Sequence, residues 1–157
     1  MGLNFFAPVG DGIIDDTKAI QQLLDQASLN NSVLSLSGKK TYLVSSLRLK
    51  NGIKSFFCEG VIKGMGNSTH GIITFDGSIF GGKYVSNFTI SVNLDMSAGD
   101  SFGIFAYGCT NCVFQNNYIY GLTNSNKVSR FGIYLRDGAN YNKIINKLYY
   151  FAHVVTK

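Results

Sequence analysis

Residues 103–117 read GIFAYGCTNCVFQNN, and residues 132–146 read GIYLRDGANYNKIIN. Both segments open with Gly-Ile and carry asparagine at the same two later positions, so the unit recurs after 29 residues. A third copy spans residues 71–93 and contains an insertion of eight residues, 76–83. Three copies of one unit indicate that the second half of the chain stacks a supersecondary unit on itself.

The spacing of the repeat predicts how its strands are arranged. A period of this length with strands and no helix is typical of a β-solenoid, in which each copy makes one turn. Strands of successive turns stack in parallel about 4.8 Å apart, which aligns equivalent residues in columns. The inward columns expected from this register are Ile72, Ile104 and Ile133, and Thr74, Ala106 and Leu135. The repeated asparagines are expected to hydrogen-bond to the backbone of the neighbouring turn.

The first part of the chain predicts one helix followed by strands. Asp15, Asp16 and Thr17 are typical of a helix start, because Asp15 can accept hydrogen bonds from free amides and Asp16 lies at the positive end of the helix dipole. Asn30-Asn31 ends the helix. Its apolar face is expected to comprise Ala19, Ile20, Leu23, Leu24 and Ala27. The strands expected after it are Val33–Leu36, Tyr42–Val44, Leu47–Leu49 and Phe56–Cys58.

Composition and charge exclude several classes of protein. The 157 residues are 45% hydrophobic and 15% charged, which excludes a disordered chain and suits one domain. No apolar run approaches the roughly 20 residues that span a bilayer, so membrane insertion is not expected. The net charge of +5 comes from scattered lysines and arginines rather than a basic cluster, so no nucleic-acid partner is expected.

The three cysteines, an odd number, argue against a disulfide framework. Cys109 and Cys112 form a CxxC pair, which would suit zinc or redox chemistry. A zinc site needs two further ligands, and His70 and His153 are far away in the sequence. Small buried thiols in a turn are therefore the preferred interpretation, and neither a metal nor a cofactor is expected.

Residues 6–21, FAPVGDGIIDDTKAIQ, combine a glycine turn, a helix start and an apolar helix face. This segment resembles the G-A-x-G-D-G-x-x-D-D-T-x-A-I-Q start of pectate-lyase-like right-handed β-helix proteins. The group within that superfamily that it resembles best is the bacteriophage tailspikes and capsule depolymerases. The strands at residues 47–49 and 57–60 fit the same pattern, so the resemblance extends over essentially the whole chain.

The resemblance implies an all-β fold, a single-stranded right-handed parallel β-helix with an N-terminal capping α-helix. Residues 1–31 would form the N-terminal turn and capping helix, and residues 32–157 the coils, truncated at their C-terminal end. It also implies a homotrimer in the virion tail that recognises bacterial capsular or lipopolysaccharide glycan. The intact protein would depolymerise that polysaccharide, whereas this fragment is expected to lack a complete active site.

Two other functions remain open. One is a non-catalytic β-helical fibre segment that only assembles or adheres. The other is a pectate-lyase-type polysaccharide lyase, which would need acidic residues clustered around calcium near a basic residue. The sequence contains no tight cluster of acids of that kind.

The candidate catalytic residues are carboxylates, because glycoside hydrolysis needs two of them. Asp76 and Asp137 each lie five residues after a repeat glycine. Because they lie two turns apart, the two residues are expected to be separated by roughly 10 Å, which is near the distance between the two carboxylates of an inverting hydrolase. Both precede glycine, so Asp-Gly turns are the alternative explanation. Asp95 and Asp100 flank a loop of small residues and are further candidates, with a solvated loop as the alternative.

The candidate substrate-binding residues lie on the expected outward face. If Ile104 and Ala106 point inward, Phe105 and Tyr107 point outward. The same parity exposes Tyr134 and Arg136 in the next copy, and Ile73 and Phe75 in the previous one. An apolar stripe of this kind is expected to be covered, either by sister subunits or by stacked sugar rings.

Overall fold

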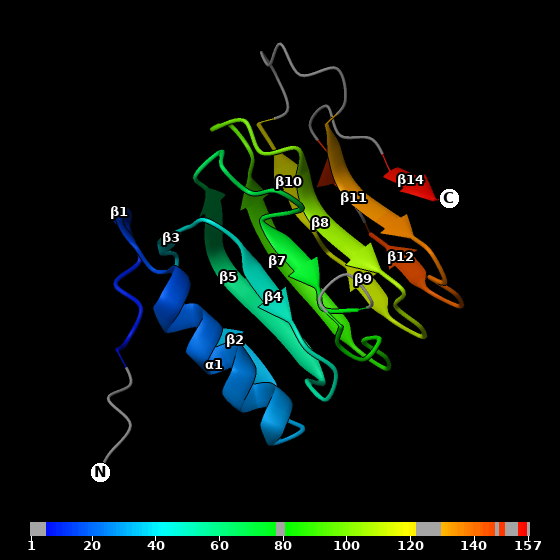
Figure 1. Cartoon of the computed structure of the whole chain (residues 1–157). Helices are drawn as coiled ribbons and strands as arrows, with labels where there is room; N and C mark the ends of the chain where they lie inside the picture. Colours follow the sequence, from blue (N-terminus) through cyan, green and yellow to red (C-terminus); the bar gives the residue numbers. More distant parts are fainter. Residues whose placement is uncertain (1–5, 78–80, 122–129, 147, 150–153, 157) are drawn as a thin grey trace.

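Two parallel sheets and one helix make up the computed structural model, which describes residues 6–77, 81–121, 130–146, 148–149 and 154–156 (Figure 1). The helix is α1 (Thr17–Leu29). The nine-stranded sheet contains β1 (Asp11–Asp15), β2 (Val33–Leu36), β3 (Thr41–Val44), β5 (Ser55–Gly64), β7 (Thr89–Asp95), β9 (Val113–Gln115), β10 (Tyr118–Tyr120), β12 (Lys143–Ile145) and β13 (Leu148–Tyr149). The five-stranded sheet contains β4 (Leu47–Leu49), β6 (Ile73–Phe75), β8 (Phe102–Tyr107), β11 (Phe131–Arg136) and β14 (Val154–Thr156).

The two sheets differ in regularity. The five-stranded sheet runs in the simple order β14-β11-β8-β6-β4. In the nine-stranded sheet, the ten-residue β5 pairs with both β2 and β3, and β7 pairs with both β9 and β10. The register between β5 and β7 also shifts between Phe57 and Val61. Each of these two long strands therefore pairs with two short strands along successive parts of its length.

The expected single-stranded right-handed parallel β-helix, an all-β solenoid with a capping helix, is wrong for this chain. The structure is an α/β-like arrangement of two parallel sheets and one helix. The repeated unit covers only residues 71–146, and the earlier part of the chain buries apolar residues on α1, β3, β4 and β5. Ile20, Leu24 and Ala27 of α1 belong to the same core as the buried side chains of both sheets.

The prediction of a helix after Asp16 is confirmed, with Ala19, Ile20, Leu24 and Ala27 buried. Asp15 caps its start as expected, since its Oδ1 accepts a hydrogen bond from the Thr17 amide at 2.9 Å. The Asp16 carboxylate instead turns back to the amides of Val9 and Gly10, at 2.7 and 2.9 Å. Among the described residues, no helix is long and apolar enough to cross a bilayer.

The predicted register is right for two copies and wrong for one. Ile104 pairs with Ile133, and Ala106 with Leu135, as expected. In the first copy, however, Ile73 rather than Ile72 pairs with Ile104. A shift of one residue exchanges the two faces of a strand, so Phe75 points into the core.

Aromatic packing explains this shift. The Phe75 ring stacks on Phe114 with centroids 5.6 Å apart and meets the edge of Phe88 at 5.5 Å. Burying a phenyl ring stabilises the fold more than burying a threonine, whose hydroxyl requires a partner. Thr74 takes the opposite face, and its hydroxyl accepts a hydrogen bond from the Gly71 amide at 3.0 Å.

The expected role of the repeated asparagines is confirmed at two positions. Asn117 is buried, its Oδ1 accepts a hydrogen bond from the Val92 amide at 2.9 Å, and its Nδ2 donates to the Ile90 carbonyl. Asn93 Nδ2 donates to the Gly60 carbonyl at 2.8 Å. These amides join strands that neighbour one another in the nine-stranded sheet.

Candidate functional site

A cluster of aromatic rings covers the outer face of β8 and β11. It comprises Phe102, Phe105, Tyr107, Phe131 and Tyr134, and is called the aromatic cluster below. The core contains Ile104 and Ala106 of the same strand but not these rings, which places them on the side of the sheet away from the core. The expectation that Phe105, Tyr107 and Tyr134 share one outer face agrees with this arrangement, whereas Phe75 lies in the core.

The rings contact one another closely. Phe105 stacks on Tyr134 at 5.4 Å and Phe102 on Phe131 at 5.7 Å between centroids. Phe102 also meets Phe105 edge to face at 5.0 Å. Its neighbours leave Phe105 only 6% exposed, while the other four rings are half-buried. The aromatic cluster thus forms an apolar surface whose rings, apart from Phe105, are partly open to solvent.

A polar groove lies between α1 and β4 next to this surface. The groove, called the α1–β4 groove below, has a volume of about 760 Å³. Its lining residues are Asp15, Thr17, Lys18, Gln21, Gln22, Asp25, Ser45, Ser46, Arg48, Lys50, Thr69 and His70. The helix and the edge strand of the five-stranded sheet therefore both contribute side chains to it.

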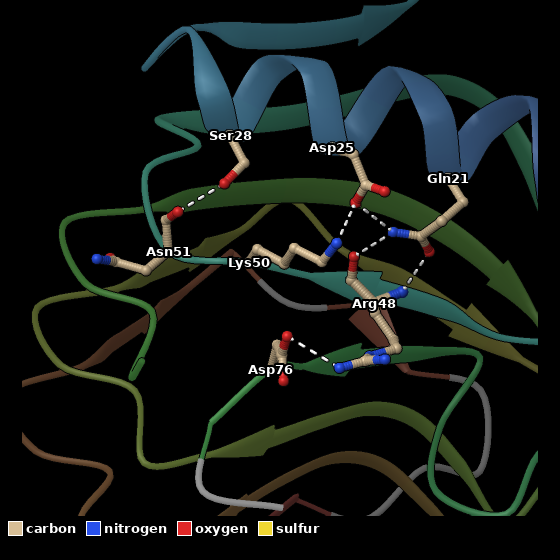
Figure 2. A network of polar contacts seen from close by, with 7 residues as sticks. All are labelled: Gln21, Asp25, Ser28, Arg48, Lys50, Asn51 and Asp76. Atoms are coloured by element: carbon tan, nitrogen blue, oxygen red, sulfur yellow. Dashed lines mark hydrogen bonds and ion pairs between the residues drawn. The ribbon is translucent and has the colours of Figure 1, made fainter. Parts of the chain in front are cut away.

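Gln21 fixes the helix against the edge of β4 (Figure 2). Its Nε2 donates to the Arg48 carbonyl at 2.9 Å, and its Oε1 accepts a hydrogen bond from the Arg48 amide at 2.8 Å. The side-chain amide thus satisfies both backbone groups of Arg48, as a neighbouring strand would. Gln21 Nε2 also donates to Asp25 Oδ1 at 2.9 Å, which orients that carboxylate toward the groove.

Two ion pairs cross the same region (Figure 2). Lys50 Nζ lies 3.0 Å from Asp25 Oδ1, and Arg48 Nη2 lies 3.0 Å from Asp76 Oδ2. The Asp76 side chain is 9% exposed. Its second oxygen, Oδ1, is buried and has no hydrogen-bond partner among the described residues. Asp76 and Lys50 also line a second groove, of about 450 Å³, that continues from the first.

His70 connects the α1–β4 groove to the aromatic cluster. Its ring lines the groove and meets the Phe105 ring edge to face, with centroids 5.4 Å apart. The groove and the cluster therefore form one continuous surface, apolar over β8 and β11 and polar beside α1.

Asp76 and Asp137, the predicted pair of catalytic carboxylates, each lie in an ion pair with an arginine. Asp76 is bound to Arg48, and Asp137 Oδ2 lies 2.7 Å from Arg136 Nε. Asp137 and Gly138 both have positive φ, at 44° and 83°, so the alternative of an Asp-Gly turn describes them. Each carboxylate has an arginine partner, and their use as an inverting pair stays a prediction.

The carboxylates of Asp95 and Asp100 accept hydrogen bonds from residues of loops. Asp95 Oδ1 accepts a hydrogen bond from the Ser97 amide at 2.9 Å, which closes a turn. Asp100 is fully buried and accepts hydrogen bonds from the Gly66 amide at 3.0 Å and the Ser68 hydroxyl at 2.7 Å. Both carboxylates hold loops in place, and neither lines the α1–β4 groove.

Cys109 and Cys112 are buried side by side. A hydrogen bond between the two thiols, together with burial, raises the pKa of Cys109, and the same bond lowers the pKa of Cys112. Among the described residues, no group of three or more metal-ligating side chains comes together.

Sequence reasoning missed the polar half of this surface. Gln21, Asp25, Arg48, Lys50 and His70 were not predicted as site residues, although one signal was available. Arg48 and Lys50 alternate with leucines in and after Leu47–Leu49, so both belong on the outer side of that strand. No sequence pattern linked them to α1, because Gln21 and Arg48 are 27 positions apart.

A scan of the chain against models of known protein families matches none of them, and a search of curated proteins finds no match. Among solved structures, the chain is similar to a candidate glycosyl hydrolase from Parabacteroides merdae ATCC 43184, with 12% sequence identity and a TM-score of 0.45. The match covers 96% of this chain and 95% of that chain. A likeness at this level identifies neither a family nor an activity for this chain.

Proposed function

We propose that this chain binds bacterial surface polysaccharide through the aromatic cluster and the α1–β4 groove, as a recognition part of a tailspike-like protein. The observation that carries the proposal is the aromatic cluster. Four of its five rings are half-buried and lie beside a groove rich in polar groups. Sugar rings have apolar C–H faces and polar edges, so a surface that combines aromatic rings with hydrogen-bonding groups complements them.

The resemblance of residues 6–21 to the start of tailspikes and capsule depolymerases supports the same ligand class. The groove adds donors and acceptors that are already held in place, since Gln21 fixes Asp25 and the backbone of Arg48. Preorganised polar groups bind with a smaller entropy cost than mobile ones.

The proposal is recognition without cleavage by this chain. A hydrolase needs one carboxyl that can donate a proton and a second that can act as base or nucleophile. The four predicted carboxylates are instead engaged in ion pairs or in hydrogen bonds to loop backbone. The runner-up among the sequence-based alternatives, adhesion, is therefore the one that these contacts favour.

Replacing one ring tests the proposal. In Tyr134→Ala, the ring that stacks on Phe105 is lost, and binding to an immobilised polysaccharide panel is expected to weaken about tenfold, or about 1.4 kcal/mol. The matched control is Tyr118→Ala, which removes a tyrosine from a stacked pair on the nine-stranded sheet and should leave binding unchanged.

Light scattering on both variants shows whether these rings instead form a contact between subunits. If Tyr134→Ala instead abolishes self-association of the chain and no polysaccharide binds the unaltered protein, the aromatic cluster is a subunit interface and the proposal is wrong. Equal polysaccharide binding by the Tyr134→Ala and unaltered proteins would also contradict it.

A further inference from the structure

We infer that the polysaccharide recognised by this surface is neutral and rich in hydroxyl groups, rather than a polymer of uronic or sialic acids. The inference rests on the proposed function and concerns the chemical class of its ligand. It comes from the ion pairs and the buried acceptor atoms that line the two grooves.

The cations on the outer face of the five-stranded sheet are already paired. Arg48 and Lys50 each lie 3.0 Å from a carboxylate oxygen, of Asp76 and Asp25 respectively. Arg136, next to the aromatic cluster, lies 2.7 Å from Asp137. An anionic sugar that approached any of these cations would also approach the carboxylate beside it, and like charges at that distance repel.

The charges around the α1–β4 groove also balance. Its lysines and arginine are Lys18, Arg48 and Lys50, and the carboxylates that line it or pair with these cations are Asp15, Asp25 and Asp76. The second groove adds Lys83. The two grooves together therefore carry four cations and three carboxylates, a near balance that provides little long-range attraction for a polyanion.

Much of the excess positive charge of the chain lies elsewhere. Lys63 belongs to β5 of the nine-stranded sheet, Lys39 and Lys40 precede β3, and Lys54 precedes β5. The net charge of +5 is therefore not concentrated on the proposed binding surface.

Two oxygen atoms beside the grooves disfavour a further carboxylate nearby. Asp76 Oδ1 and Gln22 Oε1 are buried and have no hydrogen-bond partner among the described residues. Gln22 lines the α1–β4 groove and Asp76 the second groove. A ligand carboxylate brought close to these acceptors would donate no hydrogen bond and would add negative charge beside Asp76.

The direct test compares polymers of the two classes at low and high salt. Isothermal titration with dextran, mannan and galactan is expected to show binding by at least one, with a Kd that changes less than about twofold between about 50 and about 500 mM NaCl. Polygalacturonate, alginate and hyaluronan are expected not to bind. Binding of the acidic polymers alone, weakening about tenfold or more with salt, would overturn the inference and leave the proposed function standing. If neither class bound, the proposed function itself would fail.

A variant provides a second readout. Asp76→Asn keeps the shape of the side chain but leaves Arg48 without this carboxylate, so binding of polygalacturonate should become detectable while affinity for the neutral polymer falls. Asp95→Asn is the matched control, since it removes a carboxylate from a turn of the nine-stranded sheet and should change neither affinity. A folded Asp76→Asn protein with the preference of the unaltered chain would contradict the inference.

Discussion

Cys58 is a buried thiol whose protonation links stability to pH. Burial raises its pKa from a usual value of 9.0 to about 11. The folded protein therefore holds this proton more tightly than the unfolded chain. The stabilising contribution is full below about pH 9 and is lost as the pH rises toward 11.

The expected result is a steeper loss of stability at high pH in the unaltered protein than in Cys58→Ala. Between about pH 8 and about pH 10.5, the free energy of unfolding should fall by about 2 kcal/mol more when Cys58 is present. Urea unfolding at both values measures this difference. Parallel pH profiles for the two proteins would show that Cys58 is not the group that titrates.

At the scale of the element, Gln21 joins α1 to β4. In Gln21→Ala, the amide and carbonyl of Arg48 lose their side-chain partners, and the free energy of unfolding is expected to fall by about 1–2 kcal/mol. Gln26→Ala is the control, because it changes the same residue type in the same helix, and the Gln26 side chain makes no hydrogen bond with the described residues. Urea unfolding that gave equal losses for the two variants would count against this role of Gln21.

The elements also show how much of the fold could be predicted from sequence. The face of α1 was predictable because helical periodicity depends on neighbouring residues. The register of β6 was not, because Ile72, Ile73, Thr74 and Phe75 offer apolar residues on both faces. The choice depended on Phe88 and Phe114, rings that reach Phe75 only after the sheets pack.

The candidate site divides in the same way. Alternation along a strand placed Phe105, Tyr107 and Tyr134 together, since one rule of parity is sufficient for that prediction. To predict the partners of Asp76 and Asp137, the positions of Arg48 and Arg136 would also have been needed. Spacing within the repeat gave no information about Arg48, which lies outside it.

At the scale of the whole molecule, the homotrimer stays a proposal, and we place the contact between its subunits at β1. This strand is the terminal strand of the nine-stranded sheet, and Ile13 and Ile14 are 79% and 51% exposed. Exposed edge strands with apolar side chains pair readily with other chains. Association through β1 would leave the aromatic cluster available for polysaccharide.

Light scattering of Ile13→Lys checks this placement. The unaltered chain is expected to show a mass above 17.2 kDa that rises with concentration, and Ile13→Lys should shift it toward the monomer. Tyr141→Lys, which alters a side chain that is 84% exposed elsewhere, should leave the mass unchanged. A monomeric unaltered chain at every concentration would refute both the homotrimer and its placement.

The bond between Gln21 and Arg48 has a consequence for fibril formation. Cross-β growth requires that an incoming chain finds free amide and carbonyl groups along the edge strand. β4 is only three residues long, and the two backbone groups of its central residue are occupied by a side chain of the same molecule. Gln21 thus blocks growth at this edge in the way that a chain terminator blocks a growing polymer. It occupies the free amide and carbonyl of Arg48 and provides no new strand edge to which another chain could add.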